Sequence, residues 1–151
     1  MRSHKWLEDQ LELVMRKYFS NIKISNPVEI KWGREAKYRF GSIRLIKPKG
    51  IRLLSNRSHP QRSVITITSM FKDGAIGEKV VHYTIAHELC HYAHGFSSSN
   101  RRLFRHPHHG GVVNRELTER GARDLIHEFK KWLKTYRSEI LKNTKRWSKL
   151  V

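Results

Sequence analysis

The sequence contains a single cysteine, Cys90, among 151 residues. One thiol cannot form a disulfide within the chain, and it cannot build a Cys-rich zinc ribbon. This scarcity suits a reducing compartment. We therefore expect an intracellular, cytoplasmic protein, with association with the nucleoid or a nucleus as the alternative.

Long apolar runs are also missing. The most apolar stretches, "VITI" and "VVHYTIA", are far shorter than the roughly 20 residues that cross a bilayer, and "MRSHKWLEDQ" lacks the apolar segment of a secretory signal. With only four prolines and nine glycines, no Pro/Gly-rich linker divides the chain. We expect no membrane association and one domain over residues 1–151.

Acidic residues are scarce. Thirteen Asp and Glu face 31 Lys and Arg, which gives a formal net charge of +18. Both the strand-rich segment 28–62 and the end of the chain, 127–151, are basic. So large a positive field predicts an anionic partner, and DNA or another nucleic acid fits better than a membrane.

Hydrophobic periodicity predicts the elements. Leu7, Leu11, Val14 and Tyr18 indicate a helix over about residues 4–19. Short β-rich pieces follow, "VEIKW", "YRFGSIRLI", "IRLL" and "VITIT", which indicate a small antiparallel sheet. A helix "KVVHYTIAHELCHYAH" ends at Gly95, residues 95–111 form a loop, and 122–151 form a long basic amphipathic helix or two with a break. This order predicts an α+β fold.

The predicted middle helix carries the motif His-Glu-x-x-His, at His87, Glu88 and His91. Four helical residues turn through roughly 400° and rise about 6 Å, so the two histidines share a face one turn apart. They can bind one metal ion, while Glu88 can act as a base toward a water on that ion. Composition alone would produce the motif roughly 0.04 times in such a chain. The motif therefore predicts a site for one Zn²⁺ per chain.

A catalytic zinc usually takes three protein ligands and leaves one position for water. The metzincin pattern requires glycine three residues and histidine six residues after the second motif histidine, and this chain has His94 and Ser97 there. That class is excluded. The remaining candidates for the third ligand are His106, His108, His109, Glu116 and Glu119.

These residues resemble the SprT-like zinc metallopeptidases. "HYTIAHELCHYAHG" followed by "HHGGVVNRELTERG" is similar to that family's motif helix and to the His-Gly pair of its third ligand, over about residues 27–121. The resemblance implies a zincin-like domain in which His87, His91 and His109 bind zinc and Glu88 is the catalytic glutamate. The sequence departs from the family at Val113, where an aromatic residue is usual.

The leading hypothesis is a zinc-dependent metalloendopeptidase that hydrolyses peptide bonds near nucleic acid, as a monomer acting on a protein or peptide substrate. Two alternatives use the same residues differently. One is a nucleic-acid-binding protein with a structural zinc. The other is a small gluzincin-type peptidase whose third ligand is Glu119 or Glu116. A peptidase that attracts acidic protein substrates, without nucleic acid, would also explain the charge.

Overall fold

The computed structural model describes residues 1–47 and 61–150, with side chains as far as residue 146. Four α-helices and three strands follow one another along the chain, which confirms the α+β class. In chain order they are α1 (His4–Tyr18), β1 (Val28–Trp32), β2 (Gly41–Ile46), β3 (Arg62–Ile67), α2 (Glu78–Ala93), α3 (Val112–Glu119) and α4 (Arg123–Leu150), with short 3₁₀ turns at Ser69–Lys72 and His109–Gly111. The expected piece "IRLL" (51–54) lies outside the described residues.

The sheet is mixed, which corrects the expectation of an antiparallel one. The strand order is β1-β3-β2: β1 pairs with β3 in parallel, and β2 pairs with β3 antiparallel. The last strand in sequence thus lies between the first two, and its "VITI" run is buried along most of its length. Periodicity identified the strands, but it carries no information on the direction in which neighbours run.

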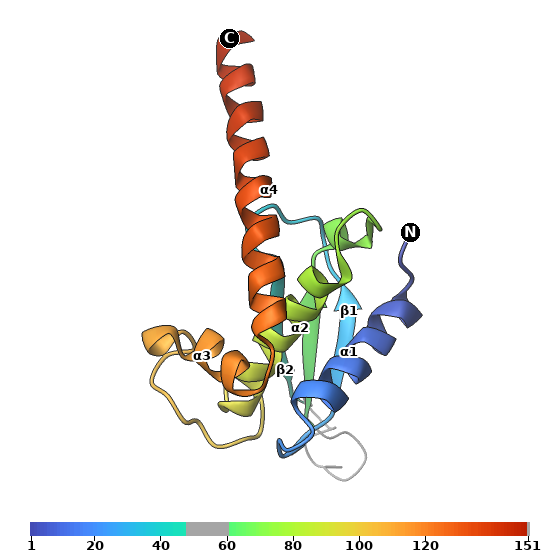
Figure 1. Ribbon diagram of the computed structural model, residues 1–151. Coiled ribbons are helices and arrows are strands. Elements are labelled where there is room, and N and C mark those ends of the chain that lie inside the picture. The colour runs from blue at the N-terminus through green and yellow to red at the C-terminus, as the bar shows by residue number, and fades with distance from the viewer. Residues whose placement is uncertain (48–60, 151) are drawn as a thin grey trace.

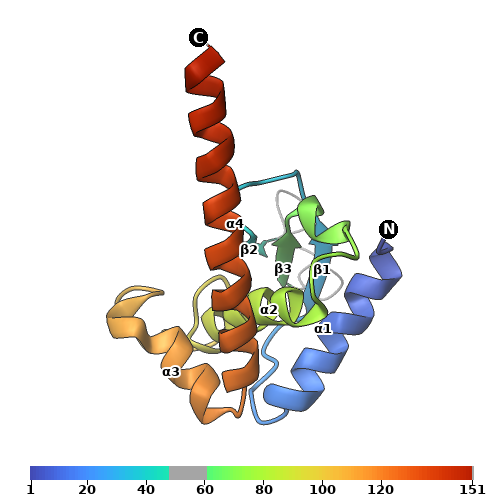
Figure 2. The same ribbon diagram turned by 45° about the horizontal axis from the view of Figure 1, so that its top comes forward.

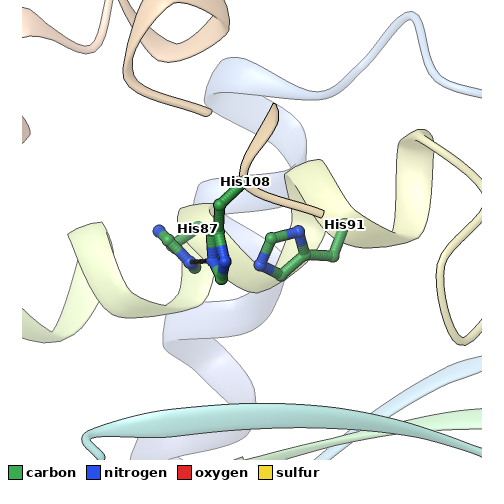
Figure 3. A group of neighbouring side chains, drawn as sticks. All are labelled: His87, His91 and His108. Atoms are coloured by element: carbon green, nitrogen blue, oxygen red, sulfur yellow. Dashed lines mark hydrogen bonds between the residues drawn. The ribbon is translucent and has the colours of Figure 1, made fainter. Parts of the chain in front are cut away.

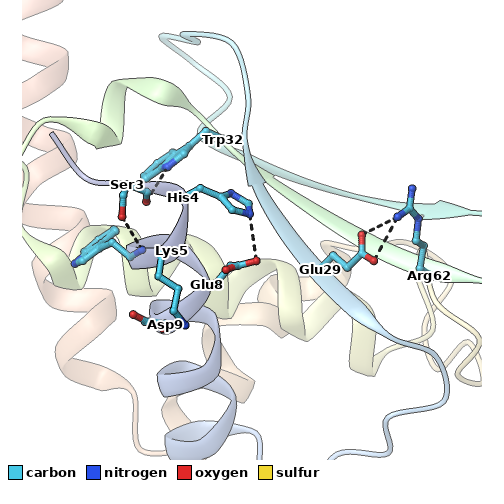
Figure 4. A network of polar contacts seen from close by, with 9 residues as sticks. Ser3, His4, Lys5, Glu8, Asp9, Glu29, Trp32 and Arg62 are labelled. Atoms are coloured by element: carbon cyan, nitrogen blue, oxygen red, sulfur yellow. Dashed lines mark hydrogen bonds and ion pairs between the residues drawn. The ribbon is translucent and has the colours of Figure 1, made fainter.

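Helices α1 and α2 cover one face of this sheet (Figures 1 and 2). The apolar side of α1 is buried as the spacing predicted, and Ser3 caps the helix by accepting a hydrogen bond from the Trp6 backbone N–H at 3.0 Å. The Trp32 indole donates to the Ser3 carbonyl at 3.2 Å and so ties β1 to the start of α1 (Figure 4). Figure 4 also shows the Arg62–Glu29 ion pair, which joins β3 to β1 at 3.1 Å.

Helix α2 lies at the centre of the molecule, in contact with α1, β2, β3, α3 and α4 (Figure 2). Because it is covered on most sides, it is apolar around most of its circumference instead of along one stripe. Cys90 belongs to this core, as expected of a small hydrophobe, and burial raises the pKa of its thiol. The motif histidines therefore sit on the most rigidly held helix of the fold.

Helix α4 packs on the body with its first half and projects beyond it with its second (Figure 1). Phe129, Trp132 and Tyr136 stack edge-on against Phe40, with ring centroids 5.2 to 6.1 Å apart. These aromatic side chains pack α4 onto the body. Among the described residues, no helix is both long enough and apolar enough to cross a membrane.

Candidate metal centre

The end of α2 is closed by a motif that directs the chain back across the helix. Gly95, at φ +82°, donates its N–H to the Tyr92 carbonyl at 3.1 Å, and Phe96 donates to the His91 carbonyl at 2.9 Å. This Schellman pattern needs a left-handed residue, which glycine supplies without strain. A Cβ at Gly95 would lie 2.5 Å from the Arg101 backbone, because the returning loop crosses there.

Buried polar contacts hold the first part of this loop. Tyr92 is fully buried and donates its hydroxyl to the Asn26 carbonyl at 2.7 Å. The Asn26 side chain accepts the Ser99 N–H at 2.8 Å and donates to Ser63 at 2.8 Å, and Ser63 donates in turn to the Ser97 carbonyl at 2.7 Å. The loop is thereby anchored to the sheet and to α2 before it reaches the motif histidines.

The loop delivers His108 to the two histidines of α2. The metal-binding nitrogens of His87, His91 and His108 all lie within 4.8 Å of one another, and the Nε2 atoms of His87 and His108 are 3.1 Å apart. Figure 3 shows the three rings turned toward a common point. The three histidines therefore lie close enough together to bind a metal ion.

His109, the third ligand implied by the family resemblance, is not part of this cluster. His108 precedes the 3₁₀ turn His109–Gly111, and at that boundary successive side chains diverge. His109 is exposed and stacks near Phe104, with centroids 6.5 Å apart. The resemblance implies His109, whereas the structure brings the adjacent His108 to the two motif histidines.

The other candidates lie elsewhere. Glu116 accepts hydrogen bonds from Arg120 at 2.9 and 3.1 Å and contacts the buried His94, on the far side of the helix end. Its pKa is lowered by hydrogen bonds from His94 and Arg120, against an opposing effect of burial. Neither Glu119 nor His106 belongs to the three-histidine cluster. Among the described residues, a glutamate third ligand finds no support in the structure.

Burial lowers the pKa values of the two motif histidines, His87 and His91, and so keeps both rings neutral. Desolvation, followed by the nearby His108, lowers the pKa of His87 to about 4. Desolvation together with the neighbouring histidines lowers the pKa of His91 to about 3. Both rings are therefore uncharged at neutral pH, so their nitrogen lone pairs are free of protons and can coordinate a cation.

Glu88 occupies a different environment one residue along. It is 6% exposed, and burial raises the pKa of its carboxyl to about 7, with Arg39 acting in the opposite direction. It lines a cleft of about 470 Å³ together with the three histidines and residues 38–43 at the start of β2. A Cβ on Gly41 would lie 3.2 Å from the Glu88 Oε1 atom, so the strand edge passes directly beside this carboxylate.

The donor set fits a tetrahedral zinc. Zinc–nitrogen bonds of about 2.0–2.1 Å place two imidazole nitrogens about 3.4 Å apart, and the cluster spans this spacing with one pair at 3.1 Å and all pairs within 4.8 Å. Three neutral imidazoles beside an open cleft are also the chemistry of a site that keeps one position for water.

Sequence reasoning missed two contributors to the site. The positive charge of Arg39, just before β2, lowers the pKa of Glu88, and the backbone of Gly41 at the start of β2 passes close to this carboxylate. The glycine in "RFGSI", inside a predicted strand, was the available signal, since a strand glycine often marks a close backbone approach. Tyr83, which also lines the cleft, donates its hydroxyl to the Asn114 side chain at 2.8 Å.

Comparison with models of protein families, with curated proteins and with solved structures found no match for this chain. The SprT-like resemblance therefore stays a prediction from the motif, and the metal centre rests on its own geometry.

Proposed function

We propose that this chain is a zinc-dependent metallopeptidase that hydrolyses peptide bonds in a protein or peptide substrate. The observation that carries the proposal is the placement of a buried carboxyl, Glu88, in the same cleft as three converging imidazoles. A cluster that only stabilised the fold would need neither the cleft nor the carboxyl. Three imidazole nitrogens favour zinc over magnesium or calcium, which prefer oxygen ligands.

The roles follow from the positions of the side chains. Zinc, when bound, polarises a carbonyl and lowers the pKa of a water to about 7. With zinc bound, Glu88, which lines the cleft, would be placed to accept the proton of that water and to return it to the leaving amine. Its raised pKa, about 7, suits a group that must both take and give a proton near neutrality. His87, His91 and His108 hold the ion.

The edge of the sheet supports a peptide substrate. In the described sheet β2 pairs only with β3, so its other edge carries unpaired backbone groups. Residues 38–43 on and before this strand line the cleft beside Glu88. An extended peptide can hydrogen-bond along such an edge, which would bring its carbonyl groups past the three histidines.

A structural zinc is the competing interpretation. Structural zinc sites are usually closed by four protein ligands. The described residues supply three, and the cluster opens into the cleft instead of being enclosed. The gluzincin-type alternative is disfavoured by the contacts of Glu116 with His94 and Arg120.

Metal content tests the site first. Native mass spectrometry of protein purified without added metal should find one zinc per chain. His108→Ala should weaken zinc binding more than about 100-fold, beyond the usual effect of removing a group that only orients a ligand. The adjacent His109→Ala is the matched control and should retain the metal. Retention by His108→Ala together with loss in His109→Ala would restore the family-implied ligand.

Activity is tested with Glu88→Gln. The amide preserves the shape of the side chain but cannot accept a proton, so zinc should stay bound while cleavage of an unfolded protein such as casein falls at least about 100-fold. A chelator should abolish cleavage by the wild type, and added zinc should restore it. Undiminished cleavage by a zinc-loaded Glu88→Gln protein would refute the role of this carboxylate.

A further inference from the structure

Helix α4 carries its positive charge on one side. At about 100° per residue, six exposed lysines and arginines fall within an arc of about 180°. They are Lys130, Lys131, Lys134, Arg137, Lys142 and Arg146, all exposed. The aromatic residues that pack on the body, such as Phe129 and Trp132, lie on the opposite side of the helix. The cationic arc therefore faces away from the contacts that hold α4 in place.

Nothing on the described surface neutralises this arc. Within residues 1–47 and 61–146, none of the six side chains forms an ion pair with a carboxylate. Glu139 is the only acidic residue between Lys130 and Arg146 in the sequence. Solubility alone does not need such clustering, because a chain of net charge +18 already repels its own copies. The charge is thus concentrated where it can meet an anionic surface.

The later part of the arc also projects from the body. The hydrogen bond from the Tyr136 hydroxyl to the Lys37 carbonyl, at 3.0 Å, joins the middle of α4 to the segment before β2. Beyond that point the helix extends past the sheet and the other helices in both views (Figures 1 and 2). From Lys130 to Arg146 the charged stretch is about 24 Å long. A partner can therefore approach it without displacing any other element.

We infer that this face of α4 is a docking surface for double-stranded nucleic acid. A helix with its side chains is about 10–12 Å across, which matches the roughly 12 Å width of the major groove of B-DNA. A duplex presents about one phosphate charge per 1.7 Å of its axis, so a 24 Å helix meets a dense anionic surface. The charge pattern, the length and the free position of α4 all match this partner.

A duplex fits better than the other anionic or helical partners. Proteins that hold single strands stack bases on aromatic side chains, and among its described residues the arc carries no Trp, Tyr or Phe. A second copy of this chain would oppose like charges. The inference goes beyond the proposed peptidase activity and does not depend on it, because neither the metal ligands nor Glu88 lie on α4.

The test compares two variants of equal charge. The first replaces Lys134, Arg137, Lys142 and Arg146 by glutamine. The control replaces Arg16, Lys23, Lys31 and Arg44, which are exposed on other elements. Each lowers the net charge from +18 to +14, since four positive charges are removed. Binding of the full-length chain to a 24-base-pair duplex of arbitrary sequence is measured by fluorescence anisotropy over a salt series.

The α4 variant should lose at least about 30-fold in affinity at 100 mM salt, and the slope of log K against log salt should fall by about 3 to 4. The duplex affinity of the control variant should change by no more than a few-fold. A third protein, with the three lysines Lys130, Lys134 and Lys142 replaced by arginine, should bind as the wild type does. Circular dichroism shows that the variants remain helical, which is expected because glutamine is a good helix former.

The inference would be overturned if the two four-residue variants lost the same amount of duplex affinity. It would also be overturned if the wild type bound the matching single strand more tightly than the duplex, or bound phosphatidylserine vesicles but not the duplex. The same measurements are made on the Glu88→Gln protein and on metal-free protein. Their duplex affinity should equal that of the wild type, so a failed peptidase proposal and a failed docking proposal give different results.

Discussion

At the scale of single residues, burial acts in opposite directions on neighbours in the motif. Removal from water disfavours charge, so it lowers the pKa of His87 to about 4 and raises that of Glu88 to about 7. In the metal-free protein His87 is therefore neutral at pH 7, and Glu88 exchanges its proton near that pH. A cation entering the cleft would favour the ionised carboxylate again, which couples the base to the metal.

The Glu88 shift predicts a pH-dependent stability. Because the folded pKa, about 7, lies above the ordinary 4.5, the folded metal-free protein holds this proton more tightly than the unfolded chain does. The resulting stabilisation is fully present below about pH 4.5 and is lost as the pH rises through about 7. The Glu88→Gln variant has no carboxyl at this position, so it does not lose this stabilisation as the pH rises. Relative to wild type, the variant should therefore gain about 2–3 kcal/mol of unfolding free energy between pH 5 and pH 8.

Urea denaturation of both metal-free proteins at the two pH values measures this difference. Titration of other groups, including His87, contributes to both proteins and cancels when the variant is compared with wild type at each pH. A constant difference across the pH range would show that Glu88 titrates at its ordinary pKa and is not desolvated in the cleft.

The motif residues were predictable because a helix fixes the geometry of positions four apart, and His87 and His91 meet as that geometry requires. The third histidine of the cluster was not predictable in the same way. His108 and His109 are adjacent, and which of them turns toward α2 depends on where the loop gives way to the 3₁₀ turn, which periodicity does not reveal.

At the scale of elements, the start of β2 and the middle of α2 are fitted closely to one another. A Cβ on Gly41 would lie 2.7 Å from the Thr84 Cγ2 atom and 3.2 Å from the Glu88 Oε1 atom. Thr84 cannot easily turn away, because it is buried and donates its hydroxyl to the Val80 carbonyl at 3.0 Å. The absence of a side chain at Gly41 is therefore part of the site.

Gly41→Ala should push β2 and α2 apart beside the Glu88 carboxylate. Overpacking of this kind costs about 1–3 kcal/mol of stability. Peptidase activity should fall about 10-fold or more, since small displacements of a catalytic group are costly, whereas zinc affinity should change far less. Calorimetry, cleavage assays and metal titration measure the three quantities.

Gly74→Ala is the control, because a Cβ there meets no atom within 4 Å. It should leave stability and activity near those of the wild type. If Gly41→Ala behaved in the same way, the close fit between β2 and α2 would not govern the position of Glu88.

The elements also show where sequence patterns stop being informative. Apolar spacing located α1, α2 and the strands because it reflects which face each element buries. The mixed sheet was not predictable by the same route, since a buried central strand such as β3 shows the same apolar run whether its neighbours are parallel or antiparallel.

At the scale of the whole molecule, the metal centre and the cationic arc lie on separable parts of the chain. The centre is built from α2, the loop that follows it and the edge of the sheet, whereas the arc runs along the outer side of α4 and reaches onto the half that projects from the body. Helix α4 packs on α2, and Phe129 of α4 lines the cleft, so the two regions are joined through the first half of α4. Because the metal-binding histidines and the arc share no residue, we expect catalysis and docking to be separable by mutation.

Deleting residues 138–151 tests this separation. Tyr136 contacts Lys37 and Phe40 of the body, whereas residues 141–146 are exposed, so we expect their removal to take away little buried surface. The shortened protein should keep its zinc and its cleavage activity and should melt within about 5 °C of the full chain. Its duplex affinity should drop as far as that of the four-residue α4 variant.

A much larger fall in melting temperature, or loss of zinc, would mean that the projecting half supports the body. Unchanged duplex affinity would instead place nucleic-acid binding on the body, where the basic strands β1 and β2 would carry it.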